Sequence, residues 1–181
     1  MTPDDHSGKS ENRSGYRVRN RSEQQQQESN FTMIEKIGVI GAGQMGNGIA
    51  HVCSLAKLDV KLIDVSQTQL DKAMDTIRRN MERQVKRGLI TAEAEKDALG
   101  RISTGLKVDL LSDRDMVVEA ATEKEAVKKE ILKSICPVLK PEALIATNTS
   151  SISITRLAAV TDRPTKFIGM HFMNPVPVMQ L

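Results

Sequence analysis

Apolar residues follow two alternating patterns after position 33. Short apolar runs, typical of strands in a parallel sheet, are separated by longer segments in which apolar residues recur every three or four positions, as on one face of a helix. The runs lie at 36–41, 59–64, 101–104, 115–120, 143–148 and 166–172, and the main helical segments at 44–57, 66–100 and 124–136. Strands that alternate with helices predict an α/β fold, with a doubly wound parallel sheet joined by right-handed crossovers.

The longest helical segment, 66–100, is an excursion after the second strand. Ser66 and Gln69 have the spacing of a capping box, and Gly88 is placed to end the first helix. Thr91 can begin a second, shorter helix. One face of the first helix is predicted to carry Leu70, Met74, Ile77, Met81 and Val85.

Residues 1–32 lack any such period. They are rich in Ser, Asn, Gln and Arg and include four consecutive glutamines. Such a segment buries too little apolar surface to offset its ordering entropy, so we expect a disordered tail. A targeting peptide is the alternative, but equal numbers of acidic and basic residues argue against it. Met33, just before the first strand, is a possible true start, which makes residues 33–181 the expected domain.

Composition excludes several classes of function. The net charge of +3 is distributed over interspersed acidic and basic residues, and aromatic residues make up 2% of the chain, which argues against nucleic-acid binding. No apolar run reaches 18 residues, so no membrane span is expected. Cys53 and Cys136 are far apart and lie in apolar helical patterns, which predicts two reduced, buried thiols in a cytoplasmic protein and no metal site.

The stretch "VIGAGQMGNGIA" contains the pattern G-x-G-x-x-G at Gly41, Gly43 and Gly46. It follows a strand and opens a helix, and this context indicates a Rossmann-type dinucleotide site. We expect Gly41 to permit the tight turn, Gly43 to let a pyrophosphate approach the backbone, and Gly46 to let helix and strand pack closely. The amides of Gln44 and Met45 then face the phosphates.

Asp64 ends the second strand, 18 residues after Gly46. A carboxylate at this place accepts hydrogen bonds from both ribose hydroxyls of the adenosine. It would repel a 2′-phosphate, and Val65 and Ser66 offer no cation to offset that repulsion. The sequence therefore predicts NAD, rather than NADP, as the cofactor.

Polar residues also follow later strands, where ligands bind in open parallel sheets. His171 suits a general base that removes a hydroxyl proton, whereas His51 is expected to be a satisfied packing histidine. In the segment 147–153, "TNTSSIS", Thr149, Ser150 and Ser151 either cap the following helix or present hydroxyls to a cofactor or substrate. Glu119 and Glu123 follow the fourth strand in the same way.

These residues together resemble the 3-hydroxyacyl-CoA dehydrogenase family, in particular its short-chain bacterial branch. The similarity runs from Met33 to Leu181. It is carried by "KIGVIGAGQMGNGIA", "VVEAATEKEAVKKEI", "NTSSISITRLA" and "FIGMHFMNPVPVM". The resemblance implies oxidation of an (S)-3-hydroxyacyl-CoA, such as 3-hydroxybutyryl-CoA, to the 3-ketoacyl-CoA, or the reverse reaction, in fatty acid metabolism.

The resemblance also implies residue roles. His171 is the expected catalytic base, Ser150 the expected partner of the substrate 3-oxygen, and Asn174 an expected neighbour of nicotinamide and substrate. The resemblance further implies cofactor contacts by Glu123 and Lys128, and contacts of the excursion 66–100 with coenzyme A at Asn80 and Arg87.

In the family, "HFMNPVPVM" leads to a glutamate that pairs with the histidine, and then to an all-helical dimerisation domain. By that spacing the glutamate falls two positions beyond Leu181, so we expect the chain to be a fragment that binds NAD with little catalysis of its own, from a protein that is a homodimer. Two alternatives remain: a nucleotide-binding pseudoenzyme or redox sensor, and a Rossmann dehydrogenase of another hydroxy acid.

Overall fold

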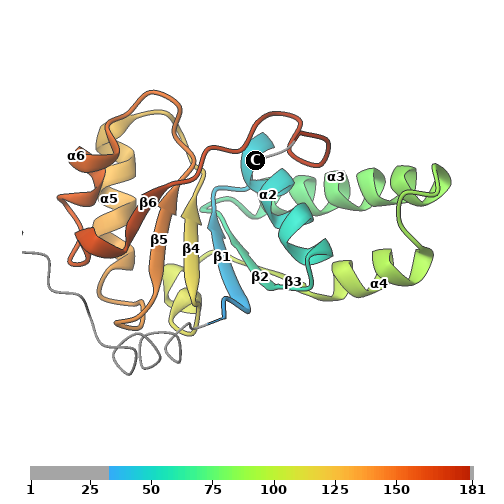
Figure 1. Ribbon diagram of the computed structural model, residues 1–181, viewed down its shortest axis with the longest axis horizontal. Helices are drawn as coiled ribbons and strands as arrows, with labels where there is room; N and C mark the ends of the chain where they lie inside the picture. The colour runs from blue at the N-terminus through green and yellow to red at the C-terminus, as the bar shows by residue number, and fades with distance from the viewer. Residues whose placement is uncertain (1–32, 180–181) are drawn as a thin grey trace, which may run out of the picture. The chain divides into compact units, whose positions relative to one another are not determined.

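The computed structural model of the protein describes residues 33–179. The tail predicted at residues 1–32 lies outside this range. Figure 1 shows a single sheet with helices packed against it. The six strands are β1 (Lys36–Ile40), β2 (Asp59–Ile63), β3 (Ile102–Gly105), β4 (Met116–Glu119), β5 (Leu144–Thr147) and β6 (Phe167–Gly169).

The strands pair in the order β3-β2-β1-β4-β5-β6, and every pair is parallel. This is the order of a doubly wound nucleotide-binding sheet, in which the direction of winding reverses between β1 and β4. The predicted α/β fold is therefore confirmed. The predicted helical excursion is also present, between β2 and β3.

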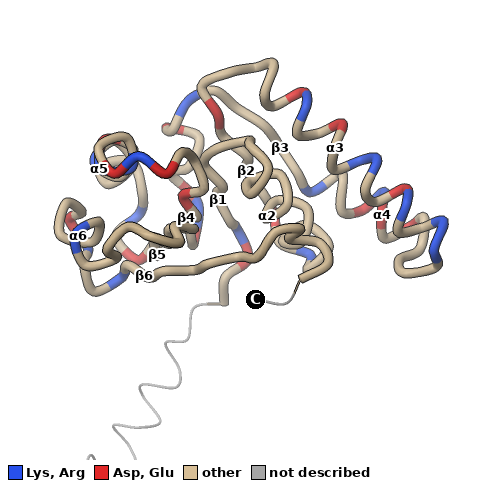
Figure 2. Tube along the Cα trace, turned by 90° about the horizontal axis from the view of Figure 1, so that it is seen from above, with Lys and Arg blue, Asp and Glu red and all other residues tan. Residues whose placement is uncertain are grey.

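The connecting helices are α2 (Gln44–Leu55), α3 (Gln67–Lys86), α4 (Ala92–Gly100), α5 (Glu125–Ile135) and α6 (Ile154–Ala158), with short 3-10 turns η1 (Val108–Leu111) and η2 (Pro164–Lys166). The long amphipathic α3 and the shorter α4 form the excursion. Acidic and basic residues are interspersed along both helices, as the colouring of Figure 2 shows. The helix expected after 147–153 is α6, which has only five residues.

Two apolar cores lie on opposite faces of the sheet. Successive side chains of a strand point to opposite faces, so Val39 and Leu62 contribute to one core, and Ile40 and Ile63 to the other. The first core is completed by α2, α3 and α4, and the second by α5, α6 and η1. Burial on both faces explains why these strands read as unbroken apolar runs.

The start of α3 departs from the predicted capping box in one respect. The Ser66 side chain accepts from the Gln69 amide as expected, at 3.4 Å. The Ser66 amide, however, donates to Asp64 Oδ1 at 3.0 Å, so it is not held by the side chain of Gln69. At the other end of the helix, Gly88 has φ = 69°, a left-handed conformation that suits the predicted stop.

No helix within residues 33–179 is long and apolar enough to cross a membrane. The thiols of Cys53 and Cys136 are buried and unpaired, as the sequence predicted. Burial raises the pKa of the Cys53 thiol to about 11, so this group is protonated at neutral pH.

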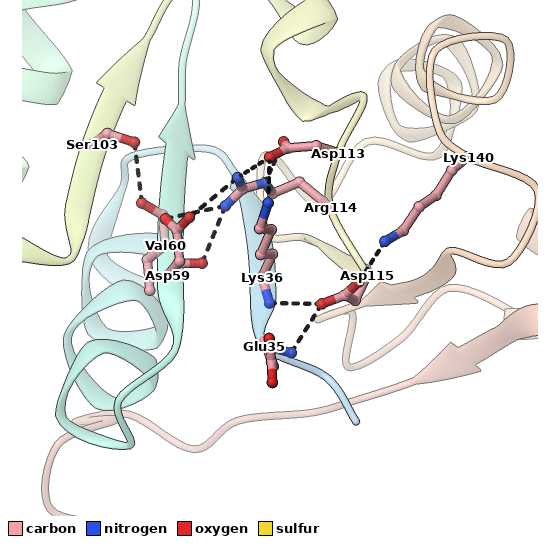
Figure 3. A network of polar contacts seen from close by, with 9 residues as sticks. All are labelled: Glu35, Lys36, Asp59, Val60, Ser103, Asp113, Arg114, Asp115 and Lys140. Carbon is pink, nitrogen blue, oxygen red and sulfur yellow. Dashed lines mark hydrogen bonds and ion pairs between the residues drawn. The ribbon is translucent and has the colours of Figure 1, made fainter. Parts of the chain in front are cut away.

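The amino ends of the strands carry a connected group of ions, drawn in Figure 3. The side chain of Arg114 is 2% exposed, and its guanidinium contacts both Asp113 and Asp59. Asp115 Oδ2 accepts from the amides of Glu35 and Lys36 at 2.9 and 2.8 Å, and its other oxygen pairs with Lys140. The group thus joins the starts of β1, β2 and β4 and the loop before β5, at the edge opposite the glycine turn.

Burial opposes ionisation of Asp115, but the hydrogen bonds from Lys140 and from two backbone amides outweigh it and lower the pKa of this carboxyl. Hydrogen bonds from Arg114 likewise hold the pKa of Asp113 far below its usual range. A folded-state pKa below the unfolded value of roughly 3.9 adds stability above that pH. This contribution disappears as the pH falls through the folded-state pKa.

We expect Asp115→Asn to lower the free energy of unfolding at pH 7 by about 1–2 kcal/mol, because one charged acceptor is lost from three hydrogen bonds. The difference from the wild type should narrow as the pH falls below the unfolded pKa of roughly 3.9 and then through the lower folded-state pKa of Asp115. Urea unfolding at pH 7 and pH 3 measures both effects. Asp75→Asn, which removes an exposed i,i+3 ion pair with Arg78, should change the free energy of unfolding little. An equal loss in both variants would contradict the expected role of Asp115.

Candidate cofactor and active site

The turn between β1 and α2 contains the three glycines of the motif, and at two of these positions there is room only for glycine. Gly41 has φ = 99°, and a Cβ there would lie 2.7 Å from the Ala120 carbonyl oxygen. A Cβ at Gly46 would lie 1.6 Å from the Gly41 carbonyl oxygen. A Cβ at Gly43, in contrast, has no atom within 4 Å. Gly41 and Gly46 are therefore required by the turn itself, and Gly43 leaves its outer surface open for a ligand.

The start of α2 presents free backbone donors. Within the described range no side chain caps this helix, whose N-cap is Gly43. The amides of the first turn, including those of Gln44 and Met45, have no partner inside the helix and lie at the positive end of its dipole. This arrangement fits the pyrophosphate of a dinucleotide.

Asp64 lies beside the same turn. Its Oδ2 accepts from the Ala42 amide at 2.8 Å and its Oδ1 accepts from the Ser66 amide at 3.0 Å. These two bonds fix the orientation of the carboxylate, and each oxygen keeps a lone pair for a further donor. The carboxylate is thus placed to receive ribose hydroxyls.

A pocket of about 490 Å³ adjoins Asp64 and the glycine turn. It is lined by Gly41, Gly43 and Asp64, and by apolar side chains that follow β3 or belong to α5: Leu106, Val108, Val127 and Ile131. A lining that combines the Asp64 carboxylate with apolar side chains suits a ribose and a flat base. The residues present therefore fit the adenosine half of NAD.

His171 lies beyond the last strand, although the sequence predicted a strand over 166–172. β6 ends at Gly169, because its partner β5 ends at Thr147, which is paired with Gly169. The Met170 amide still donates to the Thr147 carbonyl oxygen at 3.0 Å. The imidazole of His171 is exposed, at the same edge of the sheet as the glycine turn.

Asn174 is tied to the glycine turn. The side-chain amide of Gln44 donates to Asn174 Oδ1 at 3.1 Å. Two residues later, Val176 is 5% exposed and packs against Gly48 of α2. A Cβ added at Gly48 would lie only 2.7 Å from the Cβ of Val176. The segment after β6 therefore runs over α2, as Figure 1 shows, and brings Asn174 to the first turn of that helix.

The turn that carries Ser150 is organised by Thr149. Its hydroxyl donates to Glu123 Oε2 at 2.7 Å and accepts from the Ile152 amide at 3.1 Å. Ser150 is exposed next to it. The N-cap of α6 is Ser153. Thr149, Ser150 and Ser151 therefore do not cap this helix.

Lys128 lies within α5 and is buried against Glu119. Its ammonium group donates to both oxygens of the Glu119 carboxylate, at 2.9 and 2.8 Å, and the two side chains are 1% and 0% exposed. The Ala121 amide and the Thr147 hydroxyl also donate to Glu119. Sequence reasoning missed this pair, and a contact of Lys128 with the cofactor stays a prediction.

We expect Lys128→Met to lower the free energy of unfolding by about 3 kcal/mol, since it leaves a buried carboxylate without its cation. Adding Glu119→Gln should recover most of that loss. Lys133→Met, on the same helix but in an exposed pair with Glu130, is the matched control and should have a small effect. Urea unfolding measures all three. A loss below about 1 kcal/mol for Lys128→Met would contradict the importance of the pair.

Asn80 and Arg87 line a second pocket, of about 240 Å³. Arg83 and Gln84 complete its wall on α3, and Pro175, Pro177 and Val178 form the opposite wall. The sequence analysis did not single out Arg83 and Gln84. The sequence could have indicated them, because positions 80, 83, 84 and 87 follow helical spacing and share one face of the helix.

His51 connects α2 to the same helix face. It is fully buried, and its Nε2 is 3.0 Å from Gln84 Oε1. Burial lowers the pKa of the imidazole, which is therefore neutral at pH 7. The sequence predicted a satisfied packing histidine, but Nδ1 has no hydrogen-bond partner within the described residues.

Comparison with known proteins agrees with this geometry. Residues 36–181 match the family model described as "3-hydroxyacyl-CoA dehydrogenase, NAD binding domain". Over 149 residues the chain is 60% identical to a 3-hydroxybutyryl-CoA dehydrogenase of Bradyrhizobium diazoefficiens. The matched region covers 82% of this chain and 51% of the relative. A probable 3-hydroxybutyryl-CoA dehydrogenase of Deinococcus radiodurans is 45% identical, with coverage of 81% and 52%.

A solved structure shows the same arrangement. The (S)-3-hydroxybutyryl-CoA dehydrogenase of Ralstonia eutropha superposes with a TM-score of 0.80 at 46% identity, covering 82% of this chain and 53% of that one. The chain thus spans about half the length of the relatives it matches. It belongs to the 3-hydroxyacyl-CoA dehydrogenase family, and residues 36–181 are the NAD-binding domain of that family.

Proposed function

We propose that the chain is the cofactor-binding half of an enzyme that interconverts (S)-3-hydroxyacyl-CoA and 3-ketoacyl-CoA with NAD. The observation that carries this proposal is the hydrogen bond between Gln44 and Asn174. It joins the start of α2, where a pyrophosphate fits, to Asn174. His171 precedes Asn174 by three residues in the same segment. A candidate base and a cofactor turn are thus held at one edge of the sheet.

In this reaction the hydroxyl proton passes to the imidazole of His171 while a carbonyl forms at C3. NAD, when bound, supplies the acceptor for the hydride that leaves C3. The hydroxyl of Ser150 donates a hydrogen bond to the 3-oxygen, and the side chain of Asn174 holds nicotinamide and substrate together. Histidine suits the base because its ordinary pKa lies near the pH of the cell.

The pocket between α3 and residues 175–178 is the proposed site for part of coenzyme A. Arg83 and Arg87 offer two cations, and Asn80 and Gln84 offer amide donors, which together suit a phosphate group. Relatives are named for 3-hydroxybutyryl-CoA, which supports a short acyl chain. Glu123 and Lys128 belong to the proposal as cofactor contacts, although Lys128 is held by Glu119 in this structure.

The relatives continue for about as many residues again beyond the matched region, which supports a further domain next to this one in the whole protein. Met173, Val178 and Met179, which lie within eight residues after His171, are 48%, 77% and 51% exposed. Exposed apolar side chains grouped in this way suit a contact surface. We assign them to an all-helical domain through which the whole protein forms a homodimer, in the cytoplasm.

The experiment that tests this proposal joins residues 33–181 to the second half of the Bradyrhizobium diazoefficiens relative. This protein should reduce acetoacetyl-CoA with NADH at a rate on the order of 10 per second, and the 181-residue chain alone should bind NADH with little turnover. Tight NADH binding without turnover in the joined protein would contradict the proposal and favour a nucleotide-binding role. Turnover of free acetoacetate instead would favour a dehydrogenase of free hydroxy acids.

A further inference from the structure

The main chain is held on both sides of His171 by two consecutive residues at the end of β5. On one side, the Met170 amide donates to the Thr147 carbonyl oxygen at 3.0 Å. On the other side, the Phe172 amide donates to Asn148 Oδ1 at 2.7 Å. The ladder between β5 and β6 is therefore extended past its last backbone bond by a side-chain carbonyl.

Asn148 can serve as a fixed point because it is itself anchored. It is 7% exposed, and its amide donates to the Glu119 carbonyl oxygen at 2.8 Å. The adjacent Thr147 hydroxyl donates to Glu119 Oε2 at 2.7 Å. The residue that holds Phe172 is thus connected to β4 and to the buried pair of Glu119 and Lys128.

We propose that Asn148 is a positioning residue that fixes the backbone around His171 and thereby sets where the imidazole lies relative to Ser150. This role rests on the proposed function of His171 as the base. Asn148 precedes Ser150 by two residues, so one short turn carries the hydroxyl and also holds the imidazole. No hydrogen bond joins the Ser150 hydroxyl to the His171 imidazole within the described residues, whereas Asn148 is linked to both through the main chain.

The chemistry of the side chain explains why asparagine stands here. The Phe172 amide needs an acceptor at the distance of Oδ1, beyond the reach of alanine and of the shorter serine. Aspartate keeps an oxygen at the same place and should maintain the bond. Alanine and aspartate at position 148 therefore separate the loss of the acceptor from the loss of the amide group.

The test uses the full chain labelled for NMR. In Asn148→Ala, the Phe172 amide should exchange with solvent roughly five- to tenfold faster than in the wild type, which corresponds to the loss of one net hydrogen bond. The ring signals of His171, identified by their disappearance in His171→Gln, should move towards those of an unstructured histidine. Asn148→Asp should restore both the slow exchange and the native ring signals. The core amides Val39 and Val118 report on general stability and should be unchanged.

Three results would overturn the proposal: unchanged Phe172 exchange and His171 signals in Asn148→Ala, no rescue by Asn148→Asp, or equally faster exchange at Val39. Addition of NADH to the wild type tests the proposed function separately. If NADH leaves the His171 ring signals unchanged, His171 does not lie by the cofactor, whereas the effect of Asn148 on those signals is decided by the variants alone.

Discussion

Gly46→Ala is expected to abolish measurable NADH binding and to destabilise the fold by more than about 2 kcal/mol. The added Cβ would lie 1.6 Å from the Gly41 carbonyl oxygen, a backbone atom that cannot move without opening the turn. The start of α2 would then shift away from β1, and its amides would no longer converge on one point. Fluorescence titration with NADH and urea unfolding measure the two effects.

Gly43→Ala is the matched variant for the same turn. Its Cβ would have no atom within 4 Å in the protein, so folding should be unaffected. The methyl group would instead occupy the space through which a pyrophosphate approaches, and NADH affinity should fall roughly tenfold or more. Native-like NADH binding by Gly46→Ala, or by both variants, would contradict the assigned role of the turn.

His171→Ala in the joined protein described above is expected to lower kcat roughly 10²- to 10⁴-fold, the range that general base catalysis contributes. The dissociation constant for NADH should change little, because the glycine turn and Asp64 are untouched. NADH oxidation in the presence of acetoacetyl-CoA measures kcat, and fluorescence titration measures affinity. Since the imidazole is exposed, the substitution should not affect folding. A decrease in kcat below about tenfold would show that another group supplies the proton to the 3-oxygen in this direction.

The parts of the fold that depend on local pattern were predictable from the sequence. β1, the glycine turn, α2 and Asp64 form one consecutive unit, and the structure has strand, turn and helix in that order. The apolar runs 59–64 and 115–120 became β2 and β4 because both faces of each strand are buried. The alternation of strands and helices predicted the doubly wound parallel sheet.

What the sequence left out depends on contacts between distant segments. The pairing of Lys128 with Glu119 needs α5 to pack over the end of β4. The sequence marked Glu119 as a strand-end acid and Lys128 as a cofactor contact, but nothing in the sequence indicated that the two would pair. The end of β6 at Gly169 is set by its neighbour β5, whereas the apolar run continues to Phe172. Asn148 shows the same limit, because its partner Phe172 lies 24 residues away.

The most direct test of the cofactor site compares NADH and NADPH by fluorescence titration of the chain and of Asp64→Ala. Asp64 is fixed beside the glycine turn by the amides of Ala42 and Ser66, where its charge meets a 2′-phosphate. An NAD-specific site predicts that NADH binds at least roughly tenfold more tightly than NADPH, and that Asp64→Ala reduces this difference to a few-fold. Equal or tighter binding of NADPH to the wild-type chain would contradict the assignment of Asp64 and of the site as a whole.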